Sequence, residues 1–424
     1  MNVLTPESDE YERFRHSYAY RGSPSLIIFC ESADDVTSGL GFARSTGLPI
    51  SVRSGGHGVS SRSTNDGGVI VDLSRMNAVE VVDERTGVTR IGPGARWSTV
   101  ASTLDRFGLA IGSGDSGDVG VGGLAVSGGI GLLGRKFGLT IDALRSVEIV
   151  TADGVQRHAS DDENPDLFWA VRGAGGQVGI VTSFEFVANR VRDVVLDRVQ
   201  YLADDIPLLL ERWGTAVEAA PREITSFLYL TPGPPGAAVS VESVTLFAGP
   251  DGSEARSALA PFAAVVPVLE SSSTATNYAS VVPRLLGDHT GDAPPDVRCG
   301  LATHLTPGIA VAVSRLLVPG TALTVQVKAV GGAVNDVDAD ATSYAHRHQN
   351  FCLIAIGLPG NRDRLWSAWN QLYPALDGLY AAFDTDRGAL RSADAYPAAA
   401  RARLAGITAT FDPDRVFEPT SEWD

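Results

Sequence analysis

The fold of this chain is decided by a glycine-rich stretch that begins Gly114-Asp115-Ser116-Gly117-Asp118-Val119-Gly120-Val121-Gly122-Gly123 and ends at Gly138. Ten of its 25 residues are glycine, and aliphatic residues such as Leu124, Val126 and Ile130 lie between them. Each glycine costs roughly 0.5–1 kcal/mol relative to alanine inside a helix or strand. A flexible linker would have few aliphatic residues. The stretch is therefore expected to be buried backbone that approaches a ligand closely.

A second, shorter glycine segment lies upstream and reads Arg53-Ser54-Gly55-Gly56-His57-Gly58. It follows a predicted β-α-β unit, in which strands over 26–30 and 49–53 flank a helix over 32–46, and another apolar strand is expected over 69–73. The segment can be a structural turn with a locally bonded histidine, or an anion-binding loop that presents His57 to a cofactor. The spacing alone does not separate these two interpretations.

Phosphate-binding motifs are only partly matched. Residues 120–125 fit the pattern G-x-G-x-x-A, but a Rossmann motif should follow the first strand and open a helix, and here more than a hundred residues precede it. A phosphate-cradling loop of another topology fits better, because clustered glycines expose backbone N–H groups. A Walker P-loop is excluded, since the chain has only two lysines, Lys136 and Lys328, and neither follows a glycine or precedes Ser or Thr.

Composition excludes several classes of partner. The 34 Lys and Arg residues face 50 Asp and Glu residues, and the net charge of −16 argues against binding to nucleic acid or to an anionic membrane surface. The three cysteines have no C-x-x-C spacing, so neither a disulfide framework nor a thiolate metal site is indicated. The chain shows no secretory leader and no apolar run long enough to cross a membrane. A cytoplasmic location is expected.

The character of the sequence changes near residue 190. From there, helices are expected over 208–219 and 253–259 and strands over 225–230, 239–247, 323–330 and 350–356. This pattern predicts an α+β domain with an antiparallel sheet over 194–384, followed by a last segment, 385–424, that begins with a helix.

Together, these segments resemble the berberine-bridge-enzyme-like FAD-linked oxidases of the vanillyl-alcohol-oxidase superfamily. The resemblance covers nearly the whole chain and is carried by residues 49–57, 69–73, 119–131, 135, 137–139, 142, 166–173, 179–182, 331–333, 341–347, 403–404 and 411–413. It implies a PCMH-type FAD-binding domain of two subdomains over 1–193, completed by 385–424, and a substrate domain over 194–384 whose sheet roofs the flavin. The implied FAD-binding residues are Arg53, Ser54, Gly55, Gly56, His57, Gly58, Ser116, Val119, Gly120, Gly122, Gly123, Gly128, Gly129, Gly131, Asp142, Gly179, Ile180 and Val181.

The resemblance also implies an activity. The chain is expected to be an oxidase that transfers a hydride from a C–H beside O or N of a small alcohol, amine or specialised-metabolite intermediate to FAD, and then reduces O2 to H2O2. It further implies that His57 is bonded to the flavin, with tight noncovalent FAD as the alternative. A single attachment fixes the flavin and raises its reduction potential.

Several positions depart from the family pattern. Ser116 stands where many relatives have a flavin-linking cysteine, so any covalent link is single. Leu124 stands where plant members often have histidine, and Ala355 where many have Glu or Gln. The usual C-terminal Asn-Tyr pair aligns with Ala400-Arg401. A catalytic base therefore cannot be transferred from the family.

Other polar residues are candidates for catalysis. Alternation along 323–330 places Gln326 and Lys328 on one strand face, where a desolvated lysine could act as a base, although this face could equally be solvated. Tyr229 could exchange a proton, although core packing is the alternative role. If Phe351, Leu353 and Ala355 face inward, they form an apolar roof that favours an apolar or aromatic substrate.

Other functions remain open at this stage. The protein could be a flavin dehydrogenase with an acceptor other than O2, or an oxidase whose product cyclises. The missing Cys, Asn and Tyr positions also leave open a flavin-binding protein without turnover.

Overall fold

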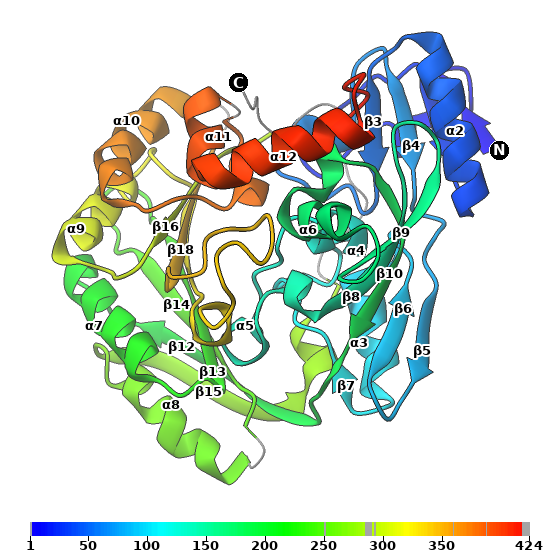
Figure 1. Cartoon of the computed structure of the whole chain (residues 1–424). Coiled ribbons are helices and arrows are strands. Elements are labelled where there is room, and N and C mark those ends of the chain that lie inside the picture. Colours follow the sequence, from blue (N-terminus) through cyan, green and yellow to red (C-terminus); the bar gives the residue numbers. More distant parts are fainter. Residues whose placement is uncertain are drawn as a thin grey trace.

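Three main β-sheets organise the chain in the computed structural model, which describes residues 2–249, 252–284, 291, 294–358, 360–386 and 388–417 (Figure 1). The first two sheets are formed by the N-terminal part of the chain, and the third by the part that begins at Asp193. The whole is a mixed α+β fold, as the sequence predicts.

The first sheet is mostly parallel and has the strand order β1-β2-β4-β3. Its strands are β1 (Asn2–Leu4), β2 (Leu26–Phe29), β3 (Ile50–Arg53) and β4 (Val69–Asp72), with α1 (Tyr11–Phe14), α2 (Ala33–Thr46) and the 3-10 turn η1 (Ser61–Ser63) between them. The predicted β-α-β unit is confirmed: β2 and β3 both pair parallel to β4. Helix α2 begins after Ser32, whose side chain accepts a hydrogen bond from the Asp35 N–H, and ends at Gly47 with φ 68°.

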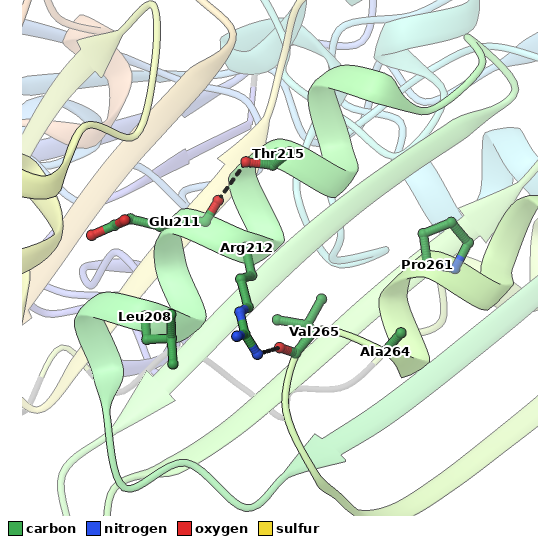
Figure 2. A pocket seen from close by; sticks show the side chains of 7 residues that line it. All are labelled: Leu208, Glu211, Arg212, Thr215, Pro261, Ala264 and Val265. Carbon is green, nitrogen blue, oxygen red and sulfur yellow. Dashed lines mark hydrogen bonds between the residues drawn. The ribbon is translucent and has the colours of Figure 1, made fainter.

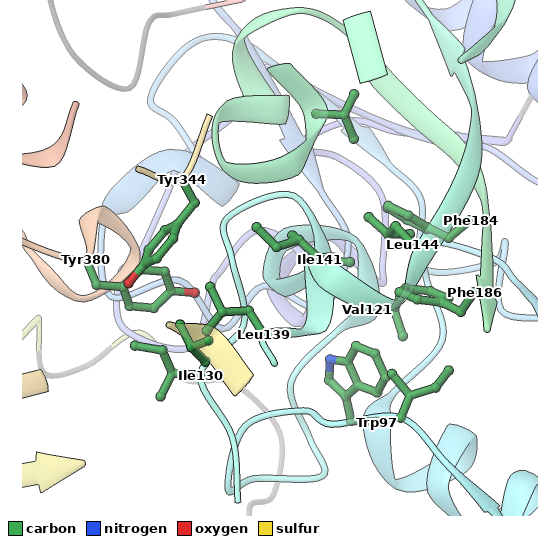
Figure 3. Close-up of a cluster of buried hydrophobic side chains, with 14 of the residues drawn as sticks. Trp97, Val121, Ile130, Leu139, Ile141, Leu144, Phe184, Phe186, Tyr344 and Tyr380 are labelled. Atoms are coloured by element: carbon green, nitrogen blue, oxygen red, sulfur yellow. The ribbon is translucent and has the colours of Figure 1, made fainter. Parts of the chain in front are cut away.

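The second sheet is antiparallel, with the order β5-β6-β10-β8-β9. Its strands are β5 (Val79–Asp83), β6 (Val88–Ile91), β8 (Leu144–Val150), β9 (Gln156–Ser160) and β10 (Ile180–Val187). The connections contain α3 (Trp97–Asp105), α4 (Val121–Ala125), α5 (Gly134–Phe137), η2 (Thr140–Ala143), α6 (Pro165–Ala174) and η3 (Gly175–Gln177), while β7 (Leu109–Ala110) pairs with β11 (Asn189–Arg190). Buried side chains, including Trp97, Val121, Phe184 and Phe186, pack between this sheet and the glycine-rich stretch (Figure 3).

The third sheet has seven antiparallel strands in the order β15-β12-β14-β13-β17-β18-β16. The strands are β12 (Asp193–Tyr201), β13 (Ile224–Thr231), β14 (Ser240–Phe247), β15 (Val268–Asn277), β16 (Asp296–Ala302), β17 (Thr324–Ala329) and β18 (Phe351–Gly357). Four longer helices, α7 (Ile206–Ala219), α8 (Ala255–Ala263), α9 (Pro307–Leu316) and α10 (Arg362–Leu372), lie along its outer side in Figure 1. Short 3-10 turns complete this part: η4 (Gly252–Glu254), η5 (Tyr278–Val281), η6 (Gly332–Val334), η7 (Tyr373–Ala375) and η8 (Ala381–Phe383).

The two faces of the third sheet have different partners, and this corrects one expectation. Phe351, Leu353 and Ala355 pack with Trp213 and Trp369 in the core beneath the helices, so they do not form a roof over the cofactor site. Successive strand residues point to opposite faces. The face toward the N-terminal part instead carries Phe227, Leu246, Cys299, Cys352 and Ile354. Cys299 and Cys352, distant in sequence, lie there as free thiols with their Sγ atoms 3.6 Å apart.

The last part of the chain returns to the N-terminal sheets. Helix α11 (Ala389–Ala395) leads into α12 (Ala398–Phe411), which runs across to the first sheet in Figure 1. Arg403 bonds Asp166 of α6 at 2.7 Å, Arg44 of α2 bonds Asp414 at 2.8 Å, and Phe417 packs in the core of the first sheet. None of the helices among the described residues is long and apolar enough to cross a membrane.

Candidate functional site

A cavity of about 410 Å³ is lined by residues of the first two sheets, of the glycine loops and of the C-terminal part of the chain from Leu379 onward. Its wall contains four stretches of backbone that are rich in glycine or small residues. They are the loop after β3 (Ser54, Gly55, Gly56, His57 and Gly58), the start of α4 (Val119, Gly120, Gly122 and Gly123), the end of α6 (Gly173, Ala174, Gly175 and Gly176) and the start of β10 (Gly179, Ile180 and Val181). These stretches include twelve of the predicted FAD-binding residues, which the fold brings together from positions up to 127 residues apart.

Two glycine loops contact each other at this wall. A Cβ atom built on Gly55 would lie 2.3 Å from the backbone N of Gly120, and a Cβ on Gly120 would lie 2.3 Å from the N of Gly55. Arg96 holds both loops, because its Nη1 donates to the carbonyl oxygens of Gly55, at 2.7 Å, and of Asp118. Gly55 and Gly120 are therefore required for the contact between the loops.

Other glycines in the wall leave open space. A Cβ atom on Gly123 or Gly176 would meet no atom within 4 Å, although both residues line the cavity. Side chains at these positions would occupy the cavity itself. Because glycine has no side chain, a flat ligand can lie directly against the backbone at these two positions.

His57 lines the cavity at the tip of the loop after β3. Its imidazole stacks on the Tyr18 ring, with the ring centroids 5.0 Å apart and an angle of 9° between the planes. The Tyr18 N–H donates to the Gly56 carbonyl at 2.8 Å, and Gly56 has a φ of 69° that favours glycine. The loop thus holds the imidazole against the cavity by stacking as well as by backbone geometry.

Six predicted FAD-binding residues are not among those that line the cavity: Arg53, Ser116, Gly128, Gly129, Gly131 and Asp142. Arg53 forms a buried ion pair with Asp72, its partner across β3 and β4. Gly129 and Gly131 pack directly against Thr140 and Ser113, where a Cβ would lie 2.2 Å from the Thr140 Oγ1 and 1.4 Å from the Ser113 oxygen. Arg53, Gly129 and Gly131 therefore contact other parts of the protein closely.

Asp142 has a clear structural partner. Its two carboxylate oxygens accept hydrogen bonds from Nη1 and Nη2 of Arg347 at 2.9 and 2.8 Å, and the Leu139 N–H donates to it at 2.7 Å. Both side chains are at least nine-tenths buried. This two-point ion pair ties the loop after β17 to the glycine-rich stretch.

The three predicted catalytic residues lie on neighbouring strands. Tyr229 is on β13, and Gln326 and Lys328 are on β17, where Gln326 pairs with Tyr229. None of the three is among the described residues that line the cavity. Lys328 Nζ and the Tyr229 hydroxyl, however, both donate to Oδ2 of Asp115, at 2.7 and 2.6 Å, and Asp115 does line the cavity. The solvated alternative for Lys328 is wrong, because its side chain is 2% exposed.

The protonation of this group follows from its surroundings. Burial alone would raise the pKa of Asp115, but the charge of Lys328 and hydrogen bonds from Lys328 and Tyr229 outweigh it and hold the pKa below its ordinary value. Burial and the neighbouring Asp115 charge raise the pKa of Tyr229 well above its usual range. Asp115 is therefore a carboxylate and Tyr229 a phenol at neutral pH.

Sequence reasoning missed Asp115 and the C-terminal part of the wall. Tyr380, Phe383, Arg391 and Tyr396 all line the cavity. Arg391 donates to the Cys299 carbonyl at 2.6 Å and to Asp384, and the Tyr396 hydroxyl donates to the Gly173 carbonyl at 3.2 Å. Asp115 stands next to Ser116 in the glycine-rich stretch, but nothing local in the sequence shows its two partners.

A second hollow, of about 310 Å³, lies between α7 and α8 on the outer side of the third sheet (Figure 2). Leu208, Arg212 and Val265 are among its lining residues, and Arg212 donates to the Val265 carbonyl at 3.2 Å. The hollow is open to solvent and shares no lining residue with the larger cavity.

The larger cavity suits a flavin dinucleotide. It offers glycine backbone against which a flat ring system can lie, an imidazole at one loop tip, and Ser63, whose buried Oγ has no hydrogen-bond partner among the described residues. Buried polar atoms are normally satisfied, so a ligand with acceptor groups fits this position.

Comparison with known proteins agrees with this fit. Residues 24–160 match the family model of an FAD binding domain. The (R)-6-hydroxynicotine oxidase of Paenarthrobacter nicotinovorans is 46% identical over 185 residues, which are 43% of this chain and 40% of that protein. The alignment thus spans less than half the length of this curated relative.

Solved structures match over the full length. The crystal structure of 6-hydroxy-D-nicotine oxidase from Arthrobacter nicotinovorans has a TM-score of 0.88 and 26% identity, and the match covers 100% of this chain and 97% of that one. BBE-like 1 of Physcomitrella patens shares the fold with a TM-score of 0.86 at 22% identity, over 100% of this chain and 96% of that one. Residues 24–160 therefore form an FAD binding domain, and the whole chain shares the fold of 6-hydroxy-D-nicotine oxidase.

Proposed function

We propose that this protein is an FAD-dependent oxidase that removes a hydride from a C–H adjacent to O or N of a small alcohol, amine or specialised-metabolite intermediate. The observation that carries the proposal is that His57, the glycine loops and the Asp115 carboxylate line one cavity. Bound FAD would accept the hydride and pass the two electrons to O2, which leaves as H2O2 with two protons.

Different residues of the cavity wall would contact different parts of the cofactor. The glycines at 55–58, 120–123 and 173–176 offer backbone for close approach, and β3 presents its carboxyl end to the cavity. We propose that His57 forms a single covalent bond to the flavin, as the position of its imidazole at the cavity wall allows. Ser116 has no thiol, so it cannot supply a second link.

The lining also favours a substrate with an apolar body. Leu124, Ile130, Leu379 and Phe383 contribute apolar surface, while Asp115 is a charged group within reach of a bound molecule. The (R)-6-hydroxynicotine oxidase, similar over 43% of this chain, supports an amine or alcohol with an aromatic body as the first class to test.

The test uses the purified full chain. Visible flavin absorbance should be present, and aerobic incubation with a panel of aromatic and aliphatic alcohols and amines should release H2O2 in proportion to the carbonyl or imine product. A protein without flavin absorbance would overturn the proposal. Flavin that bleaches with substrate but reoxidises slowly in air would instead indicate a dehydrogenase, and flavin that no compound bleaches would indicate a binding protein without turnover.

A further inference from the structure

Three polar residues from distant parts of the chain meet at the cavity wall. Asp115 lies in the loop before α4, Tyr229 on β13 and Lys328 on β17. Phe227 pairs with Lys328 across the two strands, so Tyr229 is the diagonal neighbour of Lys328 on the same face. Both side chains donate to one oxygen, Oδ2 of Asp115.

Of the three residues, only Asp115 lines the cavity. The Asp115 side chain is 30% exposed and lines the cavity, whereas the Lys328 side chain is 2% exposed. Lys328 and Tyr229 both donate to Oδ2 of Asp115. Among the residues that the structure describes, none of the other residues donates a hydrogen bond to Oδ1. Oδ1 is therefore the acceptor that a bound molecule can use.

The lysine is enclosed on its other sides. Its Nζ lies 4.8 Å from the ring centroid of Phe227 and 5.3 Å from that of Phe383. The Lys328 side chain is thus surrounded by two aromatic rings and one carboxylate, which is its only charged partner among the described residues. A lysine that is paired in this way as an ammonium has no lone pair with which to accept a proton. Tyr229 is already committed as a donor to Asp115. Neither residue can serve as the proton acceptor in this arrangement.

We propose that Asp115 accepts the O–H or N–H proton of the substrate, and that Lys328 and Tyr229 are positioning residues that hold its carboxylate. This inference rests on the proposed oxidase function. It assigns the role of catalytic base to Asp115 instead of Lys328, which is the candidate from the sequence. In a substrate H–C–X–H, with X as O or N, the X–H bond breaks and its proton goes to Asp115. The C–H hydrogen leaves with its electron pair to FAD, and the C=X bond forms.

The carboxylate is suited to this role although its basicity is low. The X–H proton becomes far more acidic as the hydride leaves the neighbouring carbon, so a weak base is sufficient. The titratable groups that face Asp115 are Lys328 from β17, Tyr229 from β13 and Tyr278 from η5. Of these, Lys328 supplies the largest effect that lowers the pKa of Asp115.

The first experiment compares the wild type with Asp115→Asn, which keeps the shape but cannot take up the proton. Anaerobic flavin reduction, measured by stopped flow with any active alcohol or amine, should slow by about 100-fold or more. Asp336→Asn is the matched control: Asp336 also pairs with a cation, Arg222, but it is exposed to solvent and does not line the cavity, so its variant should reduce flavin at the wild-type rate. Reduction by Asp115→Asn within threefold of the wild type would overturn the assignment.

The positioning role has its own readout. Lys328→Met removes the cation, so the acid limb of the pH profile of flavin reduction should move to higher pH, and Lys328→Arg should restore much of the wild-type profile. An unchanged profile in Lys328→Met would exclude the positioning role.

A binding measurement separates this inference from the proposed function. Benzyl alcohol, benzylamine and toluene are titrated against the visible flavin spectrum of the holoprotein, which requires no turnover. The wild type should prefer the two hydrogen-bond donors over toluene, and Asp115→Asn should lose about tenfold in affinity for the donors alone. If the wild type binds the alcohol and the amine but its flavin is never bleached, only the oxidase proposal is overturned. If the wild type and Asp115→Asn bind all three probes equally well, the role of Asp115 is overturned.

Discussion

Nζ of Lys328 lies 2.7 Å from Oδ2 of Asp115, although 213 positions separate the two residues in the sequence. The contact joins the third sheet to the glycine-rich loop of the N-terminal part, and it places a buried cation directly behind the cavity wall. A buried ion pair contributes little net stability compared with an apolar replacement, but removal of one partner leaves an uncompensated charge. The pair therefore can be tested through stability as well as through chemistry.

Lys328→Met should lower the free energy of unfolding by about 1–3 kcal/mol at pH 7, because the partly buried Asp115 carboxylate, whose side chain is 30% exposed, loses its cation. The folded-state pKa of Asp115 is depressed in the wild type, so the stability from its ionisation is present above the ordinary carboxyl pKa and is lost as pH falls through the lower folded value. In Lys328→Met, Asp115 can be protonated at mildly acidic pH, and the deficit should shrink there.

Urea unfolding at pH 7 and pH 4.5 measures this difference. Lys328→Arg serves as the control, because it keeps a cation opposite Asp115 and should show a smaller deficit. A deficit for Lys328→Met that is equal at both pH values would contradict the assignment of the cost to the charge of the Asp115 carboxylate.

Asp142→Asn should destabilise the fold without loss of flavin per folded molecule. The substitution removes the charge that accepts two hydrogen bonds from Arg347, a residue whose side chain is 3% exposed. Truncation of one partner of such a buried pair costs about 3–5 kcal/mol. The ratio of flavin absorbance to protein absorbance in the folded fraction should equal that of the wild type, and a lower ratio would mean that Asp142 contributes to the cofactor site directly. Arg347→Lys should also be less stable, because a lysine cannot form the two-point contact.

Gly55→Ala and Gly123→Ala should fail in different ways. A Cβ on Gly55 would lie 2.3 Å from the Gly120 backbone, so the two loops must separate, and the apoprotein should lose about 1–3 kcal/mol or more. A Cβ on Gly123 meets no atom within 4 Å, and alanine is favoured over glycine within α4. The Gly123→Ala apoprotein should therefore keep its stability.

Flavin binding, in contrast to stability, should suffer in Gly123→Ala. Because the Gly123 position lines the cavity, its new methyl group should displace the cofactor and lower the flavin content of the purified protein. Thermal unfolding of the apoproteins and flavin absorbance of the holoproteins give the two readouts. Full flavin content in Gly123→Ala would show that the cofactor does not approach this backbone.

Local patterns predicted the elements that position the site. The helix over 32–46, the strand that ends at Arg53 and the alternation that places Gln326 and Lys328 on one face all depend on spacing within a few residues, and the structure contains each of them. The loop that carries His57 follows directly from the strand end and its glycines. These features could be read from the sequence because neighbours along the chain determine them.

The rest depends on contacts between distant segments. The pKa of Asp115 is held low by Lys328 and Tyr229, which lie far from it in the sequence. The turn from Tyr380 to Phe383 becomes part of the cavity wall only because the chain returns there after the third sheet. The sequence also does not decide which face of β18 points toward the site, since Phe351, Leu353 and Ala355 are as apolar as the opposite face that carries Cys352 and Ile354. When both faces of a strand are buried, hydrophobicity gives no sign of which one faces the site.

His57→Ala should change how the flavin is held. If the imidazole at the cavity wall forms the single covalent link, acid precipitation of the wild type should leave yellow colour in the pellet, and precipitation of His57→Ala should release it to the supernatant. Ser116 offers no second attachment, so the change should be complete rather than partial. Tyr18→Ala is a useful companion, because it removes the ring that stacks on His57 at 5.0 Å but leaves the imidazole in place. It should slow flavin attachment without abolishing it. Flavin in the wild-type supernatant would instead mean that the cofactor is held by noncovalent contacts alone, and His57 would then be a residue of the loop that only borders the ring.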